Sequence, residues 1–193
     1  ALDQAKKTLS KPDATEAELN AAWKALSQAE QNLVLKTEDN KKPAVPAKNT
    51  LIEDGLFQYI VTKSDAVKGT VMIVKRTAAG KQKRSITIPD KIVKDTYVFQ
   101  VTAVSKNVFQ KDQKLKSVVI GANITNIGAK AFFNCKNLKK IRFKGKQIPK
   151  LGAKAFKGIK QNSKIFYPKQ WKLKKFQNKM KKAGVKKAVY KKK

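Results

Sequence analysis

Apolar residues recur at intervals of three and four positions in the first part of the chain, a spacing typical of amphipathic helices. One such stripe runs from Leu2 to Leu9, and a second runs from Leu19 to Leu33. The two stripes predict a helical hairpin over residues 1–35. A hairpin of this size is too small to bury a core alone, so it is either the tail of a larger helical module or it docks onto its neighbours.

The turn and the end of this hairpin carry their own signals. Residues 11–13, KPD, interrupt the apolar stripe, and Thr15 and Glu18 have the spacing of a capping box at the start of the second helix. Residues 36–50 are polar and contain two prolines, which is typical of a stiff, extended linker. We therefore expect a domain boundary in this segment.

From residue 51 the pattern changes to short runs rich in β-branched and aromatic residues, which predicts strands. The runs GLFQYIVTK (55–63) and GTVMIVKR (69–76) are separated by a polar turn and predict an antiparallel hairpin. Residues 83–104 predict two further strands across a polar turn, and Pro89 ends the first of them.

The next part of the chain repeats itself. Segments 101–120, 124–143 and 148–167 align with steps of 23 and then 24 residues. The aligned apolar sets are Val101, Ile124 and Ile148; Val104, Ile127 and Leu151; Phe109, Phe132 and Phe156; Val118, Ile141 and Ile165; and Ile120, Phe143 and Tyr167. A period in the low twenties is that of leucine-rich repeats, in which stacked units share one continuous core.

Each repeat ends in a predicted strand, and strand side chains alternate between two faces. Val118 and Ile120 therefore point inward, and Val119 and its equivalents Arg142 and Phe166 point outward. The segments around the repeated phenylalanines are predicted to form the short helical or turn side that fills the core.

The middle unit, ITNIGAKAFFNCKNLKKIRF (124–143), resembles the BspA-like leucine-rich repeat of bacterial cell-surface proteins, whose pattern is I-x-x-I-G-x-x-A-F-x-x-C-x-x-L-x-x-I-x-I. The outer units depart from this pattern: Ser105 replaces the glycine of the first, and the third lacks the cysteine and the leucine. Such departures are expected of units that cap the array. The resemblance covers roughly residues 86–167.

Residues 13–29, DATEAELNAAWKALSQA, resemble the FIVAR-type helical modules of Gram-positive surface proteins, with lower specificity. Both resemblances imply a secreted, extracellular protein at the surface of a Gram-positive bacterium. The chain begins ALDQAKK, without Met, as a processed chain or an excised fragment does, so a leader or anchor could precede it. No apolar run reaches the roughly 18 residues that a membrane-spanning helix needs.

The net charge is +32, and it is concentrated in the second part of the chain. Residues 51–193 hold 37 of the 45 basic side chains but only 6 of the 13 acidic ones. The segment 168–193 has twelve lysines and no acid. Its apolar residues predict a partly amphipathic helix and a last short strand, VKKAVY. We interpret it as a basic helical cap, and a membrane-surface helix is the alternative.

The side chains that usually carry catalysis are scarce. The chain has no histidine and one cysteine, so it lacks the commonest general base and any thiolate cluster for zinc. Cys135 occupies a core position of the repeat, and no Gly-rich phosphate loop is present. The adjacent Glu53 and Asp54 do not by themselves make an acid–base pair. We expect a non-catalytic protein without metal or cofactor.

The lysines allow two interpretations. They are either a solubilising coat or an attachment device for polyanions. The repeats place equivalent residues in rows, which predicts a basic outward face made of Lys116, Lys139, Lys140, Arg142, Lys144, Lys164 and Phe166. The expected partner is a host or envelope protein, an anionic glycan or a cell-wall polymer. Nonspecific nucleic-acid binding is the rival hypothesis, although lysine lacks the bidentate fork that base readout favours.

The predicted fold is thus a mainly β (α+β) leucine-rich-repeat solenoid preceded by a helical hairpin. The predicted domains are a helical hairpin (1–35), a linker (36–50) and a repeat domain (51–193). The repeat domain divides into an N-terminal β-hairpin cap (51–97), the repeats (98–167) and a basic C-terminal helical cap (168–193). The oligomeric state stays open.

Overall fold

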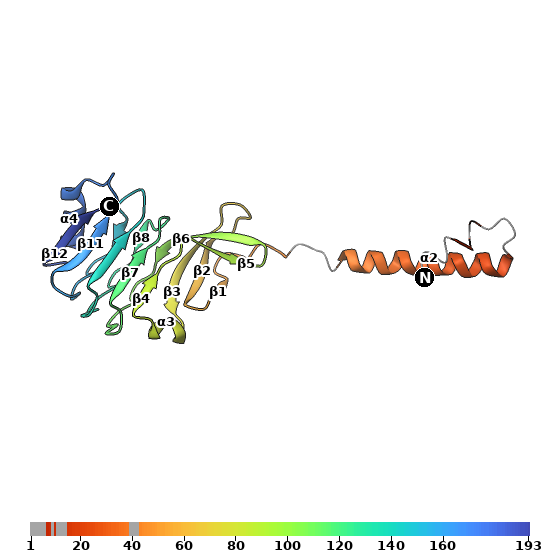
Figure 1. The fold of residues 1–193 in the computed structure, drawn as a ribbon, viewed down its shortest axis with the longest axis horizontal. Coiled ribbons are helices and arrows are strands. Elements are labelled where there is room, and N and C mark those ends of the chain that lie inside the picture. Colours follow the sequence, from red (N-terminus) through yellow and green to blue (C-terminus); the bar gives the residue numbers. More distant parts are fainter. Residues whose placement is uncertain (1–6, 9, 11–14, 39–42) are drawn as a thin grey trace. The chain divides into compact units, whose positions relative to one another are not determined.

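A computed structural model describes residues 7, 8, 10, 15–38 and 43–193 (Figure 1). The chain divides into two compact units, Ala1–Pro43 and Ala44–Lys193. No helix in the described residues is both long enough and apolar enough to cross a membrane.

The first unit contains helix α2 (Glu16–Glu38). The predicted capping box is present: the Thr15 N–H donates to Glu18 Oε2 at 2.9 Å, and the Glu18 N–H donates to Thr15 Oγ1 at 3.4 Å. The helix continues three residues beyond the predicted end of the hairpin, into the segment assigned to the linker. Most of the first predicted helix, including the KPD break, lies outside the described residues.

The second unit begins with antiparallel strands β1 (Leu51–Glu53), β2 (Phe57–Lys63) and β3 (Thr70–Arg76). The pairing of β2 with β3 confirms the predicted hairpin. Part of the predicted linker also joins this unit, since the Asn49 N–H donates to the Val61 carbonyl at 2.8 Å. A short helix that was not predicted, α3 (Ala78–Gln82), follows β3.

The stretch 83–104 forms three strands where two were predicted: β4 (Ser85–Thr87), β5 (Lys91–Lys94) and β6 (Tyr97–Val104). Strands β5 and β6 make an antiparallel hairpin, while β4 pairs with a repeat strand in the other sheet. The repeat sheet therefore starts at β4, inside the segment predicted to be the N-terminal cap.

Two sheets enclose the core. One is a parallel sheet in the order β12-β11-β9-β7-β4; its remaining strands are β7 (Ser117–Ile120), β9 (Lys140–Phe143), β11 (Ser163–Tyr167) and β12 (Ala188–Lys192). The other sheet runs β1-β2-β3-β6-β8-β10, with β5 beside β6, and includes β8 (Asn126–Ile127) and β10 (Lys150–Leu151). Figure 1 shows the strands stacked side by side along the unit.

The registers confirm the repeat alignment. Val118 pairs with Ile141, and Ile141 pairs with Ile165. Ile127 pairs on its two sides with Val104 and Leu151. Because strand side chains alternate, this register places the paired apolar residues on the same side of their sheet.

The repeated phenylalanines form a ladder through the core. Phe109 and Phe132 stack with ring centroids 4.6 Å apart, and Phe132 and Phe156 stack at 5.0 Å. All three rings are fully buried. Each repeat thus covers the ring of the preceding one, which a single unit could not do for itself.

The turns that carry this ladder use left-handed backbone at two equivalent positions of each repeat. Two residues before the ring, φ is 64° at Asn107, 55° at Lys130 and 57° at Lys154. Two residues after the ring, left-handed values recur at Lys111, Asn134 and Gly158. Such values are unusual for lysine, so the turn geometry is set by the stacking of the repeats.

Helix α4 (Leu173–Lys182) follows β11 and buries Phe176 and Met180. Strand β12 then pairs in parallel with β11, with Tyr190 opposite Ile165. The predicted C-terminal helix and last short strand are both confirmed. The second unit is therefore a mainly parallel-strand, leucine-rich-repeat-like fold with few helices.

Candidate binding face of the parallel sheet

The parallel sheet turns its repeated apolar residues into the core and presents two rows of side chains on its outward face. The first row, read from strand to strand, is Thr87, Val119, Arg142, Phe166 and Lys191. The second row is Ser85, Ser117, Lys140, Lys164 and Val189. We call the residues of these two rows the outward face.

Three cations surround one aromatic ring on this face. The Lys140 amine lies 5.6 Å from the centroid of the Phe166 ring, the Arg142 guanidinium carbon lies at 5.5 Å, and the Lys193 amine lies at 5.7 Å. Each distance is within the range of a cation–π contact. We call Phe166, Lys140, Arg142 and Lys193 the Phe166 cluster.

The cluster has an excess of positive charge that no ion pair among the described residues offsets. Lys140 pairs across the sheet with Lys164, and neighbouring strands are only about 4.8 Å apart, so the two like charges repel. The described residues form three ion pairs, and none of them lies on the outward face. A bound anion would relieve this repulsion.

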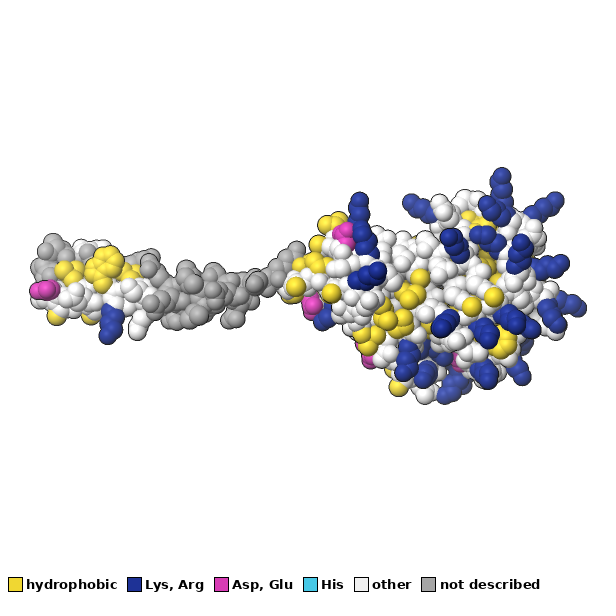
Figure 2. Space-filling model, turned by 180° about the vertical axis from the view of Figure 1, so that it is seen from behind, with side chains coloured by type: hydrophobic (Ala, Val, Ile, Leu, Met, Phe, Trp, Pro, Cys, Tyr) yellow, Lys and Arg dark blue, Asp and Glu magenta, His cyan; other side chains and the backbone are white. Residues whose placement is uncertain are grey.

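The rest of the repeat region also has an excess of positive charge. Residues 113–193 contain no Asp or Glu. Figure 2 shows Lys and Arg side chains spread over one side of this unit, with few acids among them. Such a surface attracts polyanions over distances of about a Debye length, roughly 8–10 Å.

The structure brings only part of the predicted site together. Lys140, Arg142, Lys164 and Phe166 lie on adjacent strands of the outward face, as their spacing predicted.

Lys116 is not in the row of Lys140, because Ser117 pairs with Lys140. The Lys116 carbonyl instead accepts the N–H groups of Lys139 and Lys140 at 3.0 and 3.2 Å. Lys116 and Lys139 are exposed just before β7 and β9, and Lys144 is exposed just after β9.

Two basic residues of this region were missed. Lys191 stands beside Phe166 in the register, and Lys193 completes the Phe166 cluster. The short run VKKAVY could have indicated them. If Ala188 is aligned with Ser163 as a further repeat, one step of 25 residues on, both lysines fall beside Phe166.

The scarce reactive groups have structural roles. Cys135 is fully buried and its thiol donates to the Phe109 carbonyl at 2.9 Å. Burial raises the pKa of this thiol to about 12, so it is no nucleophile at neutral pH. Asp54 accepts the Leu56 and Phe57 N–H groups at 2.8 and 2.7 Å and orders the β1–β2 turn. No group of ligands for a metal ion occurs among the described side chains.

Comparison with known proteins agrees with the repeat architecture. The family model described as "BspA type Leucine rich repeat region" matches residues 102–180. That match does not include α2, so the FIVAR-type resemblance stays a prediction. A search of curated protein sequences found no match to the chain.

Solved structures of bacterial leucine-rich-repeat proteins are similar to the chain. A leucine-rich-repeat protein from Bacteroides capillosus ATCC 29799 has a TM-score of 0.53 and 15% identity, over 73% of this chain and 98% of that one. A leucine rich cell surface protein from Faecalibacterium prausnitzii A2-165 has 29% identity and a TM-score of 0.48, over 58% of this chain and 29% of that one. This chain therefore spans less than a third of the Faecalibacterium protein.

The first of these likenesses supports the fold, and the family match covers the repeats that the register and the phenylalanine ladder describe. Residues 102–180 of this chain are thus similar to BspA-type leucine-rich repeat regions.

Proposed function

We propose that the chain is a non-catalytic binding module at the surface of a bacterium, and that its outward face binds an anionic glycan or cell-wall polymer. The observation that carries this proposal is the Phe166 cluster, in which three cations share one ring on a face without acids. The cell-surface location follows from the resemblance of the repeats to those of bacterial surface proteins.

The geometry suits an extended partner. Each repeat contributes to the same two rows, so the face offers basic groups at successive strand spacings, and solenoids commonly bind through such surfaces. In this proposal the β2–β3 hairpin and the α4–β12 segment close the two ends of the core as caps. Residues 51–193 then form the repeat domain that presents the face.

Nonspecific nucleic-acid binding is the second candidate, and the net charge of +32 favours it. The outward face offers little for base recognition, because its aromatic residue, Phe166, is already flanked by cations, and Arg142 is its one arginine. Single-strand binding uses several aromatic platforms interleaved with basic groups.

The two candidates are separated by a salt series on the full chain with purified cell walls and duplex DNA. The face variant is Lys140→Glu/Arg142→Glu/Lys193→Glu. The matched control, Lys169→Glu/Lys172→Glu/Lys174→Glu, makes the same change of charge at exposed lysines off the parallel sheet.

If the proposal holds, wall binding persists near 0.15 M salt and is lost in the face variant only. Equal loss in both variants, or binding to walls and DNA that weakens alike with log salt, contradicts it and indicates generic charge.

A further inference from the structure

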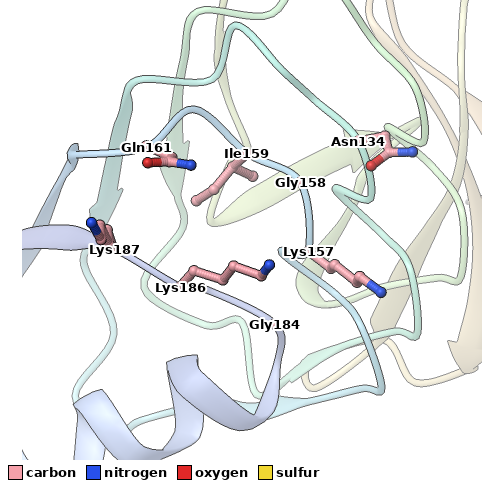
Figure 3. A pocket seen from close by; sticks show the side chains of 8 residues that line it. All are labelled: Asn134, Lys157, Gly158, Ile159, Gln161, Gly184, Lys186 and Lys187. Carbon is pink, nitrogen blue, oxygen red and sulfur yellow. The ribbon is translucent and has the colours of Figure 1, made fainter.

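A small pocket lies where the last repeat turn meets the chain that leads into β12. It has a volume of about 240 Å³ and is lined by Asn134, Lys157, Gly158, Ile159, Gln161, Gly184, Lys186 and Lys187 (Figure 3). It lies off the two rows of the outward face and is separate from the Phe166 cluster.

The pocket exists because the last unit of the stack is short. The Phe132 N–H donates to the Ala155 carbonyl at 2.8 Å, and the Phe156 N–H donates likewise to Ala183 at 2.9 Å. Gly184 therefore holds the place that Phe156 has in the preceding unit. Since Lys164 pairs with Val189, the stretch from Gly184 to β12 is three residues shorter than the stretch from Phe156 to β11.

The short unit leaves one backbone donor without its usual acceptor. The Lys111 N–H donates to the Phe133 carbonyl at 2.7 Å, and the Asn134 N–H donates to the Lys157 carbonyl at 2.8 Å. Gly158 is the third residue of this series and has the same left-handed backbone, with φ of 80°. Within the described part of the chain its N–H makes no hydrogen bond. By its place in the series, this N–H points to the next unit, where the pocket is.

The charges around this donor are all positive. Figure 3 shows the Lys186 side chain extending across the pocket toward Gly158 and Lys157, with Ile159 and Gln161 on the opposite wall. No acidic side chain lines the pocket. Backbone N–H groups in such turns contribute to anion-binding sites, and here the free N–H of Gly158 has lysines beside it.

We propose that this pocket binds a tetrahedral oxyanion, a phosphate or sulfate group carried by an acidic polymer. One oxygen takes the place of the missing carbonyl and accepts from the Gly158 N–H, while Lys186 and Lys187 supply charge from the side of β12. A tetrahedral group suits donors that arrive from several directions. This inference rests on the proposed function, which it extends by a second contact for the same class of polymer.

The test is a titration of the isotope-labelled full chain with inorganic phosphate and, separately, inorganic sulfate, followed by NMR at the Gly158 amide. The expected result is a saturable shift of this amide with at least one of the two ions. In Lys186→Gln/Lys187→Gln the dissociation constant should rise about tenfold or more, because a charge-assisted hydrogen bond is lost. The control Lys172→Gln/Lys174→Gln removes the same charge from exposed positions that do not line the pocket, and it should bind as the parent does.

Absence of a saturable shift at Gly158, or equal weakening in both variants, would overturn the inference. If the Gly158 amide does shift, titrations with poly(glycerol phosphate) and with a sulfated polysaccharide identify which polymer supplies the group. The two proposals can be refuted independently. If the outward-face variant loses polymer binding but the Gly158 amide does not shift, the proposed function is supported and the pocket plays no part in it.

Discussion

The buried ion pair between Arg76 and Asp112 joins the N-terminal hairpin to the first repeat. Arg76 Nη1 lies 2.6 Å from Asp112 Oδ2, and the two side chains are 7% and 4% exposed. The other carboxylate oxygen accepts the Lys114 N–H at 2.8 Å and the Leu115 N–H at 3.1 Å. The substitution Asp112→Asn keeps an oxygen for this turn but removes the charge that faces Arg76.

The expected loss of stability in Asp112→Asn follows from the unpaired charge that this substitution leaves in the core. Arg76 stays buried over the Phe109 ring, with its guanidinium carbon 4.9 Å from the ring centroid, and it no longer has a counter-charge. Breaking a buried pair in this way costs about 3–5 kcal/mol, and we expect about 3 kcal/mol because the turn acceptor survives. A loss of this size is a large fraction of the roughly 5–15 kcal/mol that stabilises a domain.

Urea unfolding followed by the β-sheet circular dichroism signal measures the loss. Asp95→Asn is the matched control, because Asp95 pairs with Lys94 at the surface, where an ion pair contributes at most about 1 kcal/mol. The double variant Arg76→Met/Asp112→Asn should recover most of the lost stability, since it removes the unpaired charge. A loss below about 1 kcal/mol in Asp112→Asn, or a double variant no more stable than the single one, would refute this reasoning.

Three further predictions concern the core and its turns. Phe132→Ala opens the middle of the ladder and should cost about 3–5 kcal/mol, whereas Phe166→Ala on the outward face should cost much less; equal losses in urea unfolding would contradict the ladder. Cys135 should resist a thiol reagent in the folded chain and react in urea. The pKa of the Cys135 thiol is about 12 in the folded chain and about 8.5 in the unfolded chain. The unfolded chain therefore loses the thiol proton first, and the contribution of Cys135 to stability should fall as pH rises above about 8.5. A Cys135→Ala chain is the control. Lys130→Gly should be neutral or stabilising by up to about 1 kcal/mol, since φ is 55° there, and a clear loss in thermal unfolding would contradict this.

The sequence was sufficient for the register of the repeats because each aligned apolar residue has to face the core, and a slip of one residue would expose it. It was not sufficient for β4, which joins the parallel sheet although the β5–β6 hairpin interrupts the period before β7. Lys116 lies just before β7, outside the two rows of the outward face. Polar residues at the start of a strand carry no core constraint, so their row is decided only when the hydrogen bonds are known.

The Gly158 pocket had no signal in the sequence pattern. Its free N–H is recognised by comparison with Lys111 and Asn134 in the folded stack. The Phe166 cluster was predicted in part, because Arg142 and Phe166 are equivalent positions of two aligned repeats. The missing member, Lys193, follows a strand whose step of 25 residues departs from the earlier 23 and 24.

The position of β12 at the edge of the parallel sheet has a mechanical consequence. A pulling force applied at Lys193 acts first on β12, whose neighbour in that sheet is β11. Because each unit of the stack is held by its nearest neighbours, such a load peels strands one after another and does not shear the whole sheet at once. A tethered chain of this architecture would therefore extend in small steps under flow, and it would refold from the part of the stack that remained intact.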